Sequence, residues 1–132
     1  MPIEPETEDF WPDITASAII TPASILKAQA AVLTRKSKGL IQAEVVSDPP
    51  VPPMAISHRL VLFVPALQNY RYTLLRIQHA VTPVYPLVIT EGPINFPPQI
   101  KDEANFRSWL REALSSERTK NVLDSLLAQA TA

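Results

Sequence analysis

The block between His58 and Thr90 is rich in β-branched and aromatic residues, and its apolar side chains alternate as they do in extended strands. We expect three consecutive strands, over 58–64, 70–81 and 84–90, that carry apolar residues on both faces. A sheet with two apolar faces must be covered on both sides. The pattern therefore predicts that the C-terminal helices cover one face, and that the first helix, the N-terminal arm or a partner covers the other.

The segment before this block predicts one helix and one further strand. The helix spans 22–35, where Thr21 caps its free N–H groups and Gly39 suits its C-terminal end. Residues 40–46 alternate between apolar and polar side chains and predict a half-exposed strand. The proline-rich segment 48–53 lacks several N–H groups of a sheet ladder, so we expect a polyproline-like connection there.

Two helices are expected at the C-terminal end, where apolar residues recur at three- and four-residue spacing. The first begins after Asp102 and ends near Leu114. The second begins at Ser115 or Ser116 and ends near Ala130. The resulting order is α-β-β-β-β-α-α. Short links between strands favour a mainly antiparallel four-stranded sheet, so the predicted class is α+β, with an N-terminal helix and a C-terminal helical pair.

The chain of 132 residues fits a single domain, which we place over 21–132 after an acidic arm over 1–20. The net charge is −1, yet residues 1–13 contain acids and no base. We expect the arm to be partly ordered and anchored by the apolar residues that follow these acids, Phe10, Trp11, Ile14, Ile19 and Ile20. The basic cluster Arg35, Lys36 and Lys38 is a plausible counterpart for the acids, in the same chain or in another copy.

The composition restricts the cellular setting. Cysteine is absent, which excludes disulfides and thiolate chemistry. The N-terminus lacks the basic segment and apolar core of a signal peptide, and no apolar run approaches the ~18–20 residues of a membrane span. We expect a soluble, cytoplasmic protein.

The motifs of common catalytic and cofactor sites are missing. Gly39 and Gly92 are isolated, so a phosphate-binding glycine loop is excluded. The spacings of zinc and calcium motifs do not occur. We predict no cofactor, no metal and no catalytic residue. His58 and His79 are interpreted as partly covered residues near the ends of strands.

The strongest functional candidates are Tyr70, Tyr72 and Arg76, which regular alternation places on one face of the third strand. Aromatic rings beside an arginine are typical of protein interfaces. The leading hypothesis is a non-catalytic protein-binding or adaptor protein, such as a small bacterial accessory or immunity-type factor. It would act as a homodimer or in a complex with another protein.

Two alternatives stay open. The first is an enzyme or small-ligand binder with a cleft between the sheet and the first helix, lined by the polar groups Gln29, His58, His79 and Tyr85. The second is weak nucleic-acid binding through the mildly basic body. It is less favoured because the chain has no dense stripe of lysine and arginine.

Overall fold

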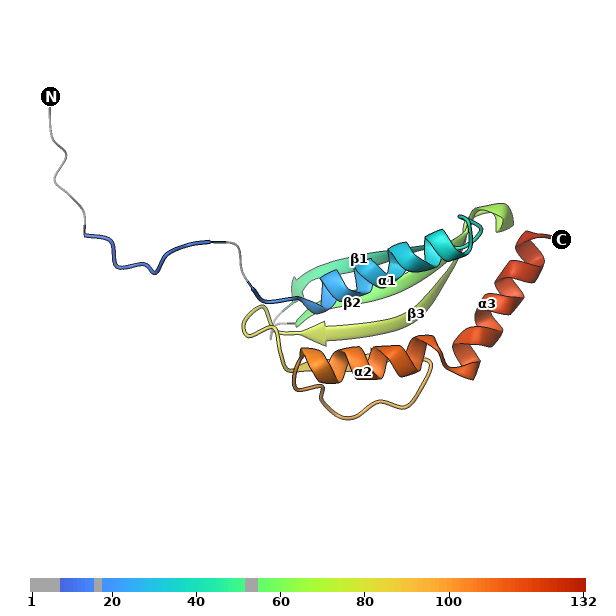
Figure 1. The fold of residues 1–132 in the computed structure, drawn as a ribbon. Helices are drawn as coiled ribbons and strands as arrows, with labels where there is room; N and C mark the ends of the chain where they lie inside the picture. Colours follow the sequence, from blue (N-terminus) through green and yellow to red (C-terminus); the bar gives the residue numbers. More distant parts are fainter. Residues whose placement is uncertain (1–7, 16–17, 52–54) are drawn as a thin grey trace, which may run out of the picture.

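A four-stranded antiparallel sheet and three helices form the fold in a computed structural model that describes residues 8–15, 18–51 and 55–132. The elements follow one another as α1 (Pro22–Lys36), β1 (Gln42–Val51), β2 (Ala55–Val64), the short 3-10 helix η1 (Pro65–Leu67), β3 (Tyr70–His79), β4 (Leu87–Glu91), α2 (Glu103–Leu114) and α3 (Glu117–Ala130) (Figure 1). The strands lie side by side in chain order. The predicted α+β class and element order are confirmed.

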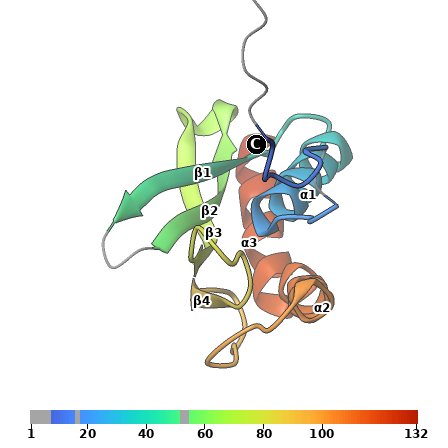
Figure 2. The same cartoon turned by 90° about the vertical axis from the view of Figure 1, so that its left-hand side faces the viewer.

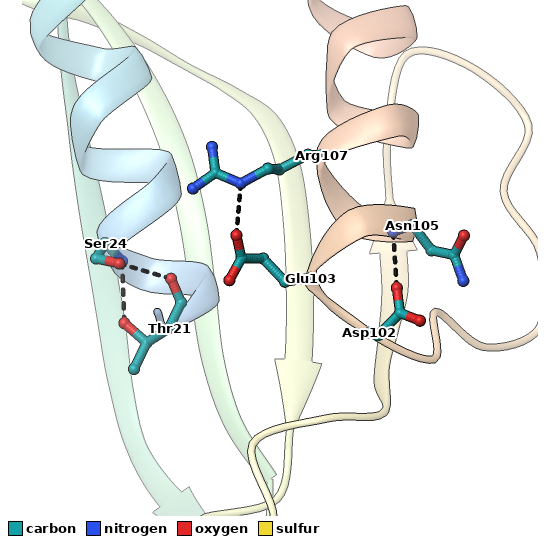
Figure 3. Close-up of polar contacts among 6 residues, drawn as sticks. All are labelled: Thr21, Ser24, Asp102, Glu103, Asn105 and Arg107. Carbon is teal, nitrogen blue, oxygen red and sulfur yellow. Dashed lines mark hydrogen bonds and ion pairs between the residues drawn. The ribbon is translucent and has the colours of Figure 1, made fainter. Parts of the chain in front are cut away.

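Side-chain caps set the starts of the helices, as the sequence predicts. The Thr21 hydroxyl accepts a hydrogen bond from the Ser24 N–H at 3.2 Å, and the Asp102 carboxylate accepts one from the Asn105 N–H at 2.9 Å. Figure 3 shows both caps, together with the ion pair that α2 makes across its first turn. After α1 the chain turns at Gly39, whose φ of +79° lies in the left-handed region that glycine adopts readily.

All three helices pack on the same face of the sheet (Figure 2). The core lies between this helical layer and the strands, and its largest members are apolar side chains from both, including Leu26, Leu62, Leu75, Ile77, Phe106 and Trp109. The expectation that the first helix or the N-terminal arm covers the second face is therefore wrong. Within the described residues, that second face carries no helix, and we call it the open face.

The open face is largely polar, which corrects the prediction that both faces of 58–90 avoid water. Arg71 of β3 forms an ion pair with Glu44 of β1, and its guanidinium lies 5.6 Å from the centre of the Phe63 ring. Arg76 pairs with Glu91 at 3.1 Å. Because long charged side chains lie over the apolar residues of this face, it does not need a second layer.

β1 is longer than predicted, because it continues through Asp48 to Val51 instead of giving way to a polyproline-like connection. Its pairing with β2 shifts between Asp48 and Val51. β1 is an edge strand, so one side of its backbone needs no ladder hydrogen bonds, and proline is tolerated there. The rest of the predicted connection, Pro52 and Pro53, lies outside the described residues.

The described part of the N-terminal arm, residues 8–15 and 18–20, contains no helix or strand and runs away from the body (Figure 1). The prediction that its apolar residues anchor it is wrong: the side chains of Phe10, Trp11, Ile14, Ile19 and Ile20 are all exposed. Across the described ranges, no helix is long and apolar enough to cross a membrane.

Candidate functional site

β3 departs from regular alternation at one point. Two core leucines of β2, Leu60 and Leu62, lie opposite Leu75 and Tyr72 respectively. One residue separates the pair on β2, whereas two separate the pair on β3, so β3 carries a bulge. A one-residue insertion reverses the face of every residue beyond it. The two tyrosines at the start of β3 therefore face the helices, whereas Arg76 faces the opposite way.

The predicted cluster of Tyr70, Tyr72 and Arg76 is therefore divided between two faces. Arg76 lies opposite Arg59 on the open face and donates a hydrogen bond from Nε to Glu91. Tyr70 and Tyr72 lie on the helical side, where Tyr72 packs against the core. The prediction that all three share one face is wrong, because the bulge divides them. The sequence does not reveal this bulge, since it depends on cross-strand register.

The two tyrosines line a groove of about 830 Å³ between β3 and α3, which we call the tyrosine groove. Figure 1 shows α3 leaving the end of α2 and running past the end of the sheet that carries η1. One wall is aromatic and aliphatic, with Leu67, Tyr70 and Tyr72. The other wall is α3, which contributes Glu117, Arg118, Asn121, Val122, Ser125, Leu126 and Gln129.

α3 is held less firmly than the other helices. Thr119 and Leu126 are its buried residues, and the Thr119 hydroxyl donates to the Ala113 carbonyl of α2 at 2.7 Å. The rest of its apolar stripe, including Val122, is only partly buried. The tyrosine groove thus combines apolar anchors with amide and hydroxyl groups and one charge of each sign. That lining suits an amphipathic segment without large net charge.

A second cluster of polar residues lies on the helical side at the other end of the strands. Ser47 Oγ lies 2.6 Å from His58 Nδ1, and His58 Nε2 lies 2.9 Å from His79 Nε2. His79 Nδ1 lies 2.7 Å from the carbonyl oxygen of Ala80. The two histidines are only 6% and 8% exposed, whereas Ser47 is exposed. We call this hydrogen-bonded chain the histidine relay.

The relay fixes the tautomer of each neutral ring. The Ala80 carbonyl can only accept, so His79 Nδ1 carries the hydrogen and His79 Nε2 is left as an acceptor. His58 must then donate from Nε2, which leaves its Nδ1 lone pair directed at Ser47. The serine hydroxyl is therefore the donor in the short contact with His58. A base and an exposed hydroxyl are in hydrogen-bond contact.

The charge state of His58 follows from its surroundings. Burial lowers the pKa of His58 most, and the neighbouring His79 and Lys27 lower it further, while Asp48 acts in the opposite direction. His58 is thus neutral at neutral pH and able to accept a proton. The sequence interpretation of two separate, partly covered histidines missed this pairing. The alternation already places each histidine on an apolar face of its strand, but only the strand register brings His58 beside His79.

The predicted ligand pocket is not assembled as a unit. Gln29 lines two small cavities beside α2 and above the sheet, and neither includes His58, His79 or Tyr85. The Tyr85 hydroxyl is buried with no hydrogen-bond partner among the described residues. Burial raises the pKa of Tyr85, and the nearby Glu103 raises it further. Of the four residues, the structure brings together only the two histidines.

Metal ligands do not cluster in the described ranges, where no three histidine, cysteine or acidic side chains could hold one ion. Comparison of the chain with protein-family models, with curated protein sequences and with solved structures finds no match. The tyrosine groove and the histidine relay are therefore interpreted from their own geometry.

Proposed function

We propose that this chain is a non-catalytic protein-binding module of the cytoplasm that holds a segment of another protein in the tyrosine groove. The observation that carries the proposal is the groove of about 830 Å³ between β3 and α3, with Tyr70 and Tyr72 on one wall. Tyrosine at the centre of a concave, partly desolvated surface is typical of binding hot spots. The partner segment would insert apolar side chains between the tyrosines and α3.

The tyrosine groove is a better candidate than the open face. The arginines of the open face that form ion pairs, Arg71 and Arg76, already contact carboxylates of this chain. A partner there would have to displace these pairs and compensate their desolvation. The apolar part of the groove lining is partly exposed, with Tyr70 half exposed, and Glu117 and Arg118 form no ion pair among the described residues, so covering the groove gains free energy without breaking an internal pair.

The test compares two arginine substitutions on α3, one in the groove lining and one outside it. Ser125→Arg places a long charged side chain in the groove, whereas Ala128→Arg makes the same change at an exposed position outside the groove lining. A protein captured from cell extract by the wild type should be retained by Ala128→Arg and weakened about tenfold or more by Ser125→Arg. Equal capture by both variants would contradict the proposal.

Photocrosslinking then locates the contact. A crosslinking amino acid at Tyr72 should attach to the captured protein. The same group at the preceding residue, Arg71, points to the open face and should not attach to it. Attachment at Arg71 alone would place the interface on the open face and overturn the choice of groove.

The histidine relay supports a second candidate function, hydrolysis of an activated ester. In this reaction Ser47 Oγ would bond to the acyl carbon while its proton passes to His58 Nδ1, and His58 would return that proton to the alcohol oxygen as its bond to the acyl carbon breaks. Water would then bond to the acyl carbon and give a proton to His58 Nδ1, and His58 would return this proton to Ser47 Oγ as the carboxylic acid leaves. His58 would keep its Nε2–H bond to His79 throughout. A fluorophosphonate probe should label Ser47 in the wild type and leave His58→Gln unlabelled. Absence of labelling in the wild type would eliminate this candidate.

A further inference from the structure

A second groove lies on the other side of α3, between that helix and the C-terminal half of α1. Its volume is about 370 Å³. The apolar lining comes from Leu33, Ile41, Leu114, Leu123 and Leu127. Lys36 of α1 and Lys120 of α3 also line this groove, together with one acid, Asp124. We call it the lysine groove.

The N-terminal arm presents side chains whose chemistry matches this lining. Phe10, Trp11 and Ile14 are 85%, 77% and 85% exposed, which is unusual for such large apolar side chains in sequence proximity. The Asp9 carboxylate accepts a hydrogen bond from the Trp11 N–H at 2.9 Å, and this local turn presents the two aromatic residues together. The described part of the arm therefore carries a pair of exposed aromatic side chains beside a local turn.

The charges of the two surfaces are complementary. Around the aromatic pair, the arm carries Glu8, Asp9 and Asp13 and no base. The lysine groove has two ammonium groups and one carboxylate, and Arg35 lies next to Lys36 at the end of α1. Each exposed ion pair contributes only about 0–1 kcal/mol. Together, however, the positive charges of the groove favour an acidic segment and fix the direction in which that segment lies.

We propose that the segment Phe10–Ile14 of one copy docks in the lysine groove of a second copy, and that the exchange is reciprocal. The occupant is a second copy because residues 8–15 of the arm run away from their own domain (Figure 1). The arm leaves that domain where α1 begins, and the lysine groove is lined by residues at the other end of α1. This dimer contact uses the opposite side of α3 from the tyrosine groove, so it does not rest on the proposed function.

Reciprocal exchange would cover both arms at once. Each large aromatic side chain buries roughly 150–250 Å², so Phe10 and Trp11 remove roughly 300 Å² or more from water on the arm. Two reciprocal contacts double this to roughly 600 Å² or more on the arms, and the exposed apolar lining of each groove is covered in addition. Reciprocal exchange therefore removes about twice as much apolar surface from water as a single contact.

The experiment measures sedimentation equilibrium of the full chain over about a hundredfold range of concentration, because self-association must follow mass action. The wild type should convert from monomer to dimer. Phe10→Ala with Trp11→Ala should raise the dimer dissociation constant about tenfold or more, whereas Thr15→Ala, an exposed change in the same arm, should leave it within about twofold.

Charge reversal tests the groove. Lys36→Glu with Lys120→Glu should weaken the dimer about tenfold, whereas Lys101→Glu, an exposed lysine that does not line the groove, should not. Adding Glu8→Lys and Asp13→Lys to the reversed groove in the same chain should restore dimer formation and leaves the Asp9 turn intact.

Three outcomes would overturn the proposal. The first is a wild type that stays monomeric at all concentrations, and the second is a dimer that the arm substitutions do not weaken. The third is an arm that folds onto its own domain, because the ten residues from Trp11 to Thr21 can span roughly 33 Å when extended. In that case the wild type would be monomeric, and Trp11 would be shielded from a fluorescence quencher at every concentration.

Discussion

Acidification from about pH 7.5 to about pH 5.5 is expected to destabilise the fold through His58. Burial, the neighbouring His79 and Lys27 lower the pKa of His58 in the folded state, whereas the unfolded chain titrates near the ordinary value of 6.5. Below that value the unfolded state binds more protons than the folded state, so the free energy of unfolding falls as the pH falls. The stabilising contribution is complete above pH 6.5 and decreases below it.

The magnitude follows from one proton. One pH unit below its pKa, an unfolded histidine is about ten times more often charged than neutral, so the linkage cost at about pH 5.5 is at most about 1.4 kcal/mol. The hydrogen-bond chain limits how many protons the relay can take up. When both rings carry a second proton, two N–H groups face each other across the 2.9 Å contact between His58 and His79. The buried relay can therefore keep its hydrogen bonds with one added proton but not with two.

The assay is urea denaturation followed by the fluorescence of the buried Trp109 at several pH values in this window, where carboxyl groups remain ionised. His58→Gln should reduce the dependence of stability on pH, and it should cost about 1–3 kcal/mol at neutral pH because buried hydrogen bonds are lost. Tyr85→Phe, which removes another buried polar group, should keep the wild-type slope. Wild-type stability that does not change with pH would refute the reasoning, as would an unaltered slope in His58→Gln.

Three further substitutions test the packing and the caps by the same denaturation measurement. Leu26→Ala empties a fully buried position on α1 and should lower the free energy of unfolding by about 2–5 kcal/mol; a loss below about 1 kcal/mol would mean that the core closes around the gap. Asp102→Ala removes the cap of α2 and should cost about 1 kcal/mol, most of which Asp102→Asn should recover. Tyr85→Phe deletes a hydroxyl without a partner, so stability should stay the same or rise by up to about 1 kcal/mol, and a clear loss would reveal a partner.

The helices and the element order were predictable because their signals are local. Thr21 and Asp102 cap the helices that the three- and four-residue spacing predicts, and each needs only the residues that follow it. The extent of β1 was not predictable in the same way. Proline in a strand is acceptable only at an edge, and the edge position of β1 follows from the order of strands in the sheet, not from its own residues.

The candidate sites depend on the register between paired strands, which cannot be predicted from the local sequence. Regular alternation groups Tyr72 with Arg76, but one extra residue in β3 relative to β2 separates them. His58 and His79 lie twenty-one positions apart and meet only because their strands pair with that register. The sequence held only a partial signal for the open face. Arg71 and Arg76 are costly on a covered face, but regular alternation assigns them to opposite faces, and only the bulge places both on one.

The apolar grooves of the folded domain lie beside α3 and not on the open face of the sheet. The sheet face without helices is covered by side chains of this chain, where Arg71 spans Phe63 and pairs with Glu44. The helical layer, by contrast, leaves α3 with a groove on each side, because its apolar stripe is too wide for the contacts it makes. A helix that buries only part of such a stripe gains stability when another segment covers the remainder. A binding partner is therefore expected on the two flanks of α3.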